Sequence, residues 1–587
     1  MAKAAKESNW KTVRVPLIGA IRWQGTYPTT TTQPYSATNV KGQFIEGYVP
    51  QVVESEITGK KKIILKVRRG WREDTSHSPN VTGYHGTCVY IDNFDVCAEA
   101  PQAYTSYDNG TFYKGTVLAG NTSASNDITA INPAVIPSIS TGSTLLITEA
   151  SSNRYYFPSA VNVNDLAFTG DISSGSAVVQ NIAGLTKICG GASTALIEMH
   201  PGQIIAGTGI PVGTRILSVD SATQITMNAN ATATTATLAM THEGIARFID
   251  TNFPSNPVGD MVELDGYLFI LDADGNIRNS DLNAPHTWSA VNTIPRSAYS
   301  DLPVTLIRWK NYIVACGNQT MEFFVNAGTA DGSPLRRIPE MLIHFGVLRS
   351  GSNLLTRPIV FLDRLFWTSS LEGAGYSGVW MLEQPGGKPV KLSPAELDPV
   401  FSYSLIYGFM SDGQAYLYWR ADRDDSYPHT FLYSFETKEW TVSGWPGLLF
   451  LASGMSSVHA VSETYTRGEL YRLSGTLGQD DQIIDGSDAV VSTIQTNPLD
   501  FDTDKNKRIH KIKLIGEQVT SQTANIQWTT DDYITWSTAQ SVELDGDDDG
   551  GSLYALGVGR RWAFRIEQTS MAGKLEALNI TYSECER

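Results

Sequence analysis

The sequence predicts an all-β fold: an irregular β-propeller with N-terminal strands, an inserted small β module and a C-terminal β domain. Helical periodicity is almost absent, whereas short apolar or alternating runs are separated by Gly, Asn, Asp, Ser and Pro. The chain carries 13 Trp, 25 Tyr and 20 Phe, and only 18% of its residues are charged. Because flat rings pack well on pleated surfaces, this composition favours sheets.

The length of 587 residues is too great for one ordinary core, so several structural units are expected. Shifts in composition along the chain suggest their boundaries. We expect N-terminal strands opening the propeller or platform at 1–105, a polar loop or hairpin segment at 106–167, an inserted small β module at 168–242, propeller blades at 243–485 and a closing β domain at 486–587.

A basic strand is predicted near the N-terminus, in KKIILKVRRG (61–70). Its apolar residues Ile63, Leu65 and Val67 alternate with charged ones, and ITGK (57–60) supplies a hairpin turn before it. The cations of this region are candidates for lining a DNA channel or contacting a neighbouring subunit, and the alternative is a solvated strand face. They are Lys60, Lys61, Lys62, Lys66, Arg68 and Arg69.

Two segments interrupt the strand pattern. Residues 106–145 are rich in Ser, Thr, Asn and Gly, which suits an exposed loop or hairpin. Residues 168–242 are rich in Ala and Thr, and GTGIPVGT (207–214) combines glycines with Pro211 as in tight turns between strands. The second segment resembles a small β module often inserted in phage structural proteins.

A coarse repeat begins near residue 255, in which a polar pair precedes an aromatic-rich strand. The steps between successive pairs are 45, 53 and 49 residues, from 265 to 310, 363 and 412. Strand repeats of about 40 to 50 residues indicate propeller blades, since one small sheet cannot bury both faces alone. The pairs are Asp265-Gly266, Lys310-Asn311, Asp363-Arg364 and Asp412-Gly413.

The net charge of −16 argues against a protein that grips DNA tightly, because such affinity comes largely from Lys and Arg at phosphates. Transient contact with DNA stays open. Five scattered cysteines do not predict a disulfide framework or a zinc site. The N-terminus has no apolar core of a signal peptide, and the longest apolar run, near 447–453, is too short to span a bilayer. We therefore expect an unsecreted chain without membrane insertion of its own.

Two stretches resemble the Asp-box hairpin, S-x-D-x-G-x-T-W, of sugar-cleaving propellers. TTDDYITW (529–536) contains Asp531 and Trp536, and SDLNAPHTW (280–288) contains Asp281 and Trp288. In an Asp-box the aspartate holds the hairpin and the Trp packs beneath it, so both stretches are interpreted as structural hairpins rather than as catalytic sites.

The enzyme hypothesis rests on Arg337-Ile338-Pro339, which resembles the element whose arginine grips a carboxylate in sialidases. This element lies mid-chain, and Arg336 stands where an aromatic residue is expected. A glycosidase also needs a pair of carboxyl groups, and nothing marks one among 60 acidic residues. A non-enzyme is the preferred interpretation, and a glycan hydrolase or a receptor-binding propeller is the alternative.

Metal and cofactor sites are not predicted. The nine histidines show no metal-binding spacing, and no phosphate loop is present. The run DGDDDG (545–550) starts like an EF-hand loop, but Leu556 occupies the position of the bidentate Glu, so a solvated turn is favoured.

Several blocks together resemble the packaged-DNA stabilisation proteins, also called tail hub or nozzle proteins, of short-tailed bacteriophages. The resemblance is most specific over VGDMVELDGYLFILDADGNIRNSDLNAPHTW (258–288) and LPVTLIRWKNYIVACGNQTMEFFVNAGTA (302–330). It extends to PLDFDTDKNKRIHKIKL (498–514), LGVGRRWAFRIEQTS (556–570) and the N-terminal residues 44–71.

The resemblance implies a virion protein without catalytic residues, assembled in the host cytoplasm and placed in the phage tail. Six copies would form a ring on the adaptor (head-to-tail connector) ring, extend the portal–adaptor channel, retain packaged DNA and conduct it during ejection. Implied partners are the other subunits, the adaptor, a tail fibre or a plug or needle protein, and DNA in transient contact.

Overall fold

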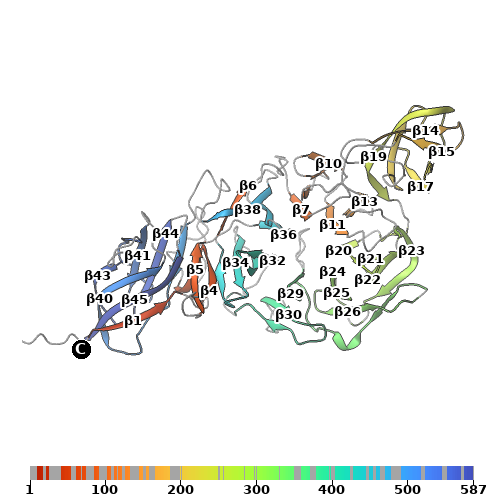
Figure 1. The fold of residues 1–587 in the computed structure, drawn as a ribbon. Helices are drawn as coiled ribbons and strands as arrows, with labels where there is room; N and C mark the ends of the chain where they lie inside the picture. The colour runs from red at the N-terminus through yellow and green to blue at the C-terminus, as the bar shows by residue number, and fades with distance from the viewer. Residues whose placement is uncertain are drawn as a thin grey trace, which may run out of the picture.

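A computed structural model describes most of the chain (Figure 1). The described residues are 10–17, 22–24, 41–54, 61–67, 69–73, 85–91, 102–107, 111–114, 117–121, 126–131, 144–149, 154–157, 166–184, 199, 201–248, 252–254, 257–282, 284–296, 298, 300–329, 331–348, 358–369, 378–394, 397, 403–422, 428–443, 448–453, 458–462, 470–477, 491–516, 523–544, 552–569 and 574–585. Their regular elements are strands and a single 3-10 turn, η4 (Pro339–Met341), so the predicted all-β class is confirmed.

Seven four-stranded units are arranged as a ring in the described part of the chain, and we number them as blades (Figure 1). Five are separate sheets, blade 2 is part of a nine-stranded sheet and blade 6 is part of a ten-stranded sheet. Blade 1 contains β7 (His85–Ile91), β8 (Gln102–Tyr107), β9 (Thr111–Lys114) and β10 (Val117–Asn121). Blade 2 contains β11 (Asn126–Ile131), β12 (Thr144–Glu149), β13 (Arg154–Phe157) and the end of β19 (Thr235–Phe248). Blade 3 contains β20 (Pro257–Leu264), β21 (Tyr267–Asp272), β22 (Asn276–Asp281) and β23 (Ala284–Pro295).

The other four blades follow in chain order. Blade 4 contains β24 (Pro303–Trp309), β25 (Tyr312–Gly317), β26 (Met321–Asn326) and β27 (Leu335–Arg337). Blade 5 contains β28 (Ile359–Phe361), β29 (Arg364–Ser369), β30 (Gly378–Leu382) and β31 (Val390–Lys391). Blade 6 contains β32 (Tyr403–Ser411), β33 (Gln414–Asp422), β34 (Pro428–Ser434) and β35 (Trp440–Val442), and blade 7 contains β36 (Leu448–Ser453), β37 (Val458–Ser462), β38 (Leu470–Leu477) and β6 (Arg69–Glu73).

The ring closes through its first and last blades. The first strand of each blade contacts the first strand of the next, and β36 of blade 7 contacts β7 of blade 1. The fourth strand of blade 7 comes from the other end of the propeller sequence, because β6 pairs with β38 at Tyr471↔Glu73 and Leu473↔Trp71. This strand ties the beginning of the propeller to its end, and the predicted β-propeller is confirmed.

The repeated polar pairs form the turn between the first and second strands of blades 3 to 6. Asp265, Lys310, Asp363 and Asp412 have φ of 54°, 56°, 61° and 52°. Positive φ is what two-residue turns between twisted antiparallel strands require, and Asp, Asn and Gly tolerate it best. In blade 5 the turn is Leu362-Asp363, so the predicted pair Asp363-Arg364 is one residue late.

Neighbouring blades bury apolar side chains between them. Trp309, Trp367 and Trp419 are all fully buried, and the indole Nε1 of Trp309 donates to the carbonyl oxygen of Asp363 at 3.0 Å. That bond joins blade 4 to blade 5. Trp367 and Trp419 lie on strands that follow the turns, and such rings supply packing that one blade cannot provide alone.

The N-terminal and C-terminal strands build one β-sandwich beside the propeller (Figure 1). Its first sheet contains β1 (Lys11–Pro16), β4 (Tyr48–Glu54), β5 (Lys61–Val67), β40 (Asn506–Gly516), β43 (Ser552–Gly559) and β45 (Lys574–Cys585). The second contains β2 (Arg22–Gln24), β3 (Lys41–Glu46), β39 (Val491–Gln495), β41 (Thr523–Thr529), β42 (Gln540–Glu543) and β44 (Ala563–Thr569). Tyr48, Leu65, Ile512, Phe564 and Ile580 are among the residues of their common core.

The sandwich and the propeller share a continuous sheet. Strand β3 pairs in parallel with β35 of blade 6, and the Gly47 N–H donates to the carbonyl of Val442 at 3.2 Å. Gly47 has φ +71°, and a Cβ there would lie 2.7 Å from Ser492 Oγ. Glycine at this crossing therefore lets the two units join.

The inserted module has its own core. Its strands are β14 (Leu166–Ile172), β15 (Val178–Ala183), β16 (Gln203–Gly207), β17 (Ile216–Ser221), β18 (Gln224–Met227) and most of β19. Phe168, Val179, Ile205, Ile225 and Met240 are buried within it. The long strand β19 pairs with β14 in the module and with β13 in blade 2, so the module extends from that blade at the edge of the molecule (Figure 1).

The strand order divides the chain differently from the predicted ranges. The range 106–167, expected as a loop or hairpin, contributes strands to blades 1 and 2, and the blades begin at 69 rather than 243. Strands within 1–105 split between the sandwich and the propeller. The reason is long-range pairing: β1 pairs with β45 and β6 with β38, and such partners are not visible in local patterns.

Candidate functional site

Asp531 holds a hairpin of the sandwich. Its carboxylate accepts from the Thr529 hydroxyl at 2.6 Å, from the Thr535 hydroxyl at 2.5 Å and from the backbone N–H groups of Ile534 and Thr535. These bonds, that from the Thr529 side chain first and then those from Thr535, lower the pKa of Asp531 to about 2. The carboxylate of Asp531 thus stabilises its own turn.

Trp536 packs in the same hairpin. The guanidinium of the buried Arg565, on β44, lies 4.1 Å from the Trp536 ring centroid, and burial lowers the pKa of Arg565 to about 10. Tyr533 Oη donates to the carbonyl of Thr496 at 2.8 Å. The hairpin joins β41 and β42, whose strands pair within the sandwich, so it lies in the part of the chain expected as the closing β domain, 486–587.

Asp281 and Trp288 lie at the end of blade 3. Asp281 accepts from Asn292 Nδ2 at 2.9 Å, across the β22–β23 pair. Trp288 is 3% exposed and meets the Phe253 ring edge-on, with centroids 4.9 Å apart. Asp281 bonds within its own blade and Trp288 contacts the segment just before the blade, and these contacts are structural.

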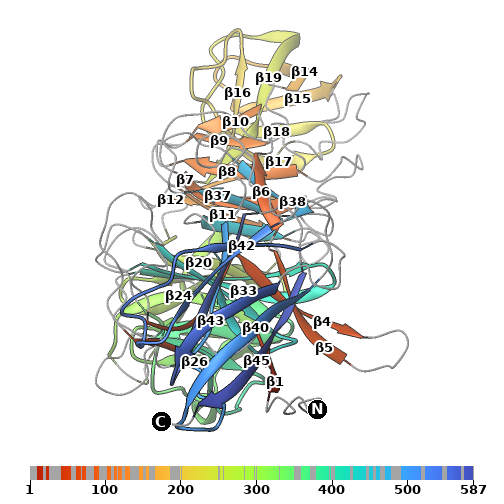
Figure 2. The same cartoon turned by 90° about the vertical axis from the view of Figure 1, so that its left-hand side faces the viewer.

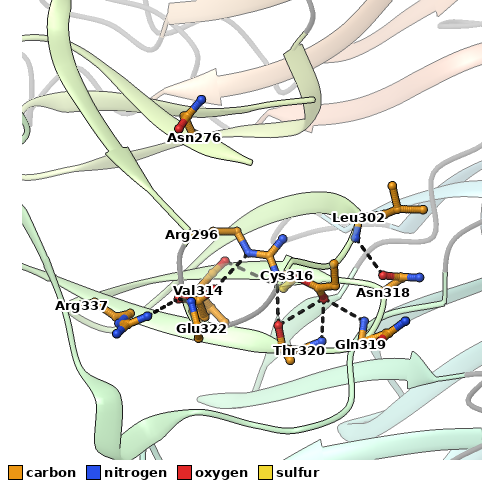
Figure 3. A network of polar contacts seen from close by, with 12 residues as sticks. Asn276, Arg296, Leu302, Val314, Cys316, Asn318, Gln319, Thr320, Glu322 and Arg337 are labelled. Atoms are coloured by element: carbon orange, nitrogen blue, oxygen red, sulfur yellow. Dashed lines mark hydrogen bonds and ion pairs between the residues drawn. The ribbon is translucent and has the colours of Figure 1, made fainter. Parts of the chain in front are cut away.

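Arg337 belongs to a buried network of charged side chains in blade 4 (Figure 3). Its Nη1 lies 3.4 Å from Oε2 of Glu322, whose side chain is completely buried. Oε1 of the same carboxylate lies 3.6 Å from Nε of Arg296, a side chain only 2% exposed. Glu322 therefore lies between two guanidinium groups (Figure 3).

Asp301 completes the network on the other side of Arg296. Arg296 Nη2 donates to Asp301 Oδ1 at 2.6 Å, and Asp301 Oδ2 accepts from the backbone N–H groups of Gln319 and Thr320 at 2.9 and 2.8 Å. A Cβ on Gly317 would lie 2.1 Å from Asp301 Oδ2. Two cations and two anions are paired, as buried charges require, and the network ties the β23–β24 connection to β26.

The sequence offered one signal for this network. Glu322 is the acid in MEFFV, a strand whose other residues are apolar, and an acid at such a position needs a buried partner. Arg296 and Asp301 lie in the connection between blades, where polar residues are ordinary, so nothing in their pattern distinguished them.

Of the six predicted basic residues, three have described side chains, and all three lie on the sandwich. Lys62 pairs with Glu576 at 2.9 Å, and Lys66 pairs with Asp412 of blade 6 at 2.9 Å. Lys61 is exposed. Lys60, Arg68 and the side chain of Arg69 lie outside the described residues. Lys66 connects the sandwich to the propeller, whereas Lys62 faces outward with 50% of its side chain exposed.

No group of three or more His, Cys, Asp or Glu side chains in the described ranges is placed to hold a metal ion. Likewise, no helix of the described chain is long and apolar enough to cross a membrane. Cys316 is buried as a free thiol and Cys585 is half-buried. The acidic run 545–550 and the turn 57–60 lie outside the description.

The closed ring of blades defines a β-propeller protein, and the contact of Arg337 with the buried Glu322 makes this arginine part of the internal scaffold. Residues 161–404 match the phage stabilisation family, described as bacteriophage P22 Gp10, beta-propeller. This segment, from the inserted module through blade 5, is similar to the phage tail and DNA-stabilisation β-propeller proteins. The resemblance predicted from the sequence is confirmed.

Other comparisons give distant likenesses. The chain is similar to BBS1N in complex with ARL6DN, soaked with lead, with a TM-score of 0.33 and 9% identity over 70% of this chain and 99% of that one. The same complex soaked with mercury gives a TM-score of 0.32 and 10% identity over 70% and 99%. BamB from Moraxella catarrhalis gives 0.30 and 12% identity over 66% and 96%. No curated protein matches the chain.

Proposed function

We propose that this chain is a subunit of a phage tail nozzle, or hub. Six copies form a ring that extends the portal–adaptor channel, retains packaged DNA and conducts it during ejection. The observation that carries the proposal is the match of residues 161–404 to the family described by bacteriophage P22 Gp10. The virion tail is then the site of action, after assembly in the host cytoplasm.

The charge of the chain supports a conduit. A net charge of −16 repels phosphates along most of a channel wall, so DNA can slide without being held. A ring with cyclic symmetry needs two different patches on each subunit, and closure of the rotation limits its size. An elongated chain with a sandwich at one end and a module at the other supplies separate surfaces for neighbours and for the adaptor (Figure 1).

The surroundings of Arg337 weigh against the sialidase-like alternative. An arginine that grips a substrate carboxylate must present its fork to a cleft, whereas Arg337 lies against the buried Glu322. In the two stretches that resemble an Asp-box, Asp531 and Asp281 accept hydrogen bonds within their own hairpins. The glycan hydrolase therefore has no observation in its favour.

The test is the oligomeric state of the purified chain, measured alone and after mixing with the adaptor protein of the same phage. Mass photometry should show a species of six copies, and electron microscopy should place it at the distal end of the adaptor ring. A chain that stays monomeric in the presence of adaptor rings would refute the proposal. Hydrolysis of labelled polysaccharide, abolished by Arg337→Ala, would instead establish the enzyme.

A further inference from the structure

We propose that the outer face of the sandwich's first sheet is a contact surface for the phosphate backbone of duplex DNA. This inference rests on the proposed function, because it names where the conduit touches its cargo. The face is formed by β43, β40, β45 and the strands β1 and β5 beside it. Figure 2 shows β40, β43 and β45 at the front of the sandwich, on the side away from the propeller.

Strand register places cations in rows across this face. Arg14 of β1 pairs with Asn579 of β45, which pairs with Lys513 of β40. The next row runs from Thr12 through Thr581 to Lys511. With strands about 4.8 Å apart, Arg14 and Lys513 stand about 10 Å from each other.

Contacts within the rows confirm that these side chains share the outer face. The hydroxyls of Thr12 and Thr581 are 3.1 Å apart, and Lys511 Nζ lies 5.1 Å from the centroid of the Tyr554 ring. In the third row, His510 Nε2 lies 2.8 Å from Ser583 Oγ, and Ser583 pairs with Arg508. The alternate residues Ile509, Ile512, Ile580 and Tyr582 point into the core.

The face is basic although the protein is acidic. Among the described residues its cations outnumber its carboxylates, and two of them, Arg14 and Lys62, keep 55% and 50% of the side chain exposed. Arg508, Lys511 and Lys513 add three more. The carboxylate described on this face is Glu576, which pairs with Arg14 and Lys62. These five described cations against one described carboxylate, on a chain of net charge −16, are a strong local reversal of sign.

The chemistry between the cations favours a DNA backbone over an acidic protein. Thr12, Asn579 and Thr581 fill the middle of the face with short hydrogen-bonding side chains, which suit phosphate oxygens. A protein interface usually has an apolar centre, and here the exposed apolar Val558 lies at the edge strand.

The aromatic rings of the face support its cations and polar groups. Trp10 stacks on His510 with centroids 4.4 Å apart, and Tyr554 lies beneath Lys511. His510 and Lys511 thus contact these rings, while Trp10 and Tyr554 stay 56% and 57% exposed.

The test is a salt titration of binding to a fluorescein-labelled random-sequence DNA duplex, followed by anisotropy with the full chain. The variant Arg14→Gln, Lys511→Gln, Lys513→Gln removes three cations of the face. Its matched control, Arg336→Gln, Lys388→Gln, Lys438→Gln, removes three exposed cations of the propeller. Circular dichroism checks that both are folded, and a second face variant, Lys62→Gln with Arg508→Gln, guards against a local packing effect.

The face variant should bind roughly tenfold more weakly at about 50 mM salt, and its slope of log affinity against log salt should be smaller by about 3, close to 0.9 for each lost phosphate contact. The control should match the wild type. Equal slopes for the two triple variants would overturn the inference, and so would a wild type that forms rings yet binds no duplex. Rings lost only in the face variant, with no DNA binding by the wild type, would assign the face to a neighbouring subunit and also overturn it. Failure of the wild type to form rings at all bears on the proposed function instead.

Discussion

Arg337 Nη1 lies 3.4 Å from the carboxylate of Glu322, and that carboxylate is completely buried between Arg337 and Arg296. The arginine that looked in sequence like a substrate-binding residue is thus part of the internal scaffold of blade 4. Its guanidinium gives the buried Glu322 carboxylate a second cationic partner in addition to Arg296.

Replacing Glu322 with Gln should therefore destabilise the protein. The change leaves Arg296 with Asp301 as its remaining acidic partner and removes the partner of Arg337, and breaking a buried pair costs about 3–5 kcal/mol. Urea unfolding measures the loss, with the exposed Glu340→Gln as the matched control. Equal midpoints for the two variants would contradict a stabilising role for the network.

Asp531→Asn should lower stability in a way that depends on pH. The folded-state pKa of Asp531 is about 2 against an ordinary 3.8, so its contribution is fully present above about pH 4 and is lost as the pH falls from about 4 towards 2. The difference between wild type and variant in thermal unfolding should shrink over that window. Asp532→Asn, at an exposed position whose carboxylate pairs with Arg561 at 3.5 Å, is the control and should show a much smaller difference. A constant difference from pH 6 to pH 2 would rule out this linkage.

Lys66 and Asp412 should be energetically coupled across the boundary between sandwich and propeller. Their charged atoms are 2.9 Å apart, and the side chains are 16% and 22% exposed. A double-mutant cycle with Lys66→Glu and Asp412→Lys should give a coupling of about 1 kcal/mol, with the double variant recovering most of the loss. The more exposed pair Lys62 and Glu576 should show less. Additive single changes at 66 and 412 would mean that the pair does not hold the two units together.

Cys316 should resist alkylation in the native protein. Burial raises the pKa of its thiol to about 12, so little thiolate exists at pH 8 and reagents cannot reach it. Mass spectrometry after brief iodoacetamide treatment should find Cys316 unmodified until denaturant is added, whereas the half-buried Cys585 reacts earlier. Early labelling of Cys316 would show that blade 4 opens readily.

The propeller could be predicted where its signals are local. The turns at Asp265, Lys310 and Asp412 need positive φ, and the strand after each must fill the space between blades. A polar pair followed by an aromatic-rich strand is therefore visible within a few consecutive residues of the sequence. Blades 1 and 2 have no such regular mark. Strand β6 and the N-terminal half of the sandwich find partners about 400 to 570 residues away, and hydrophobic patterning does not encode which strand pairs with which.

The candidate site was predicted in part for the same reason. Asp531 and Trp536 were recognised from spacing, because their contacts lie within one turn or the adjacent strand. The network around Glu322 joins a connection between blades to two strands, and the basic outer face joins β1 to β40 across β45. Both depend on tertiary pairing, which converts scattered charges into a cluster.

The oligomeric state in the presence of the adaptor protein tests the central claim most directly. We expect mass photometry of the mixture to show six copies of this chain on each adaptor ring, with electron microscopy showing an open channel along the common axis. A chain that remains a single copy, bound or free, at concentrations where the adaptor ring is intact would contradict the account.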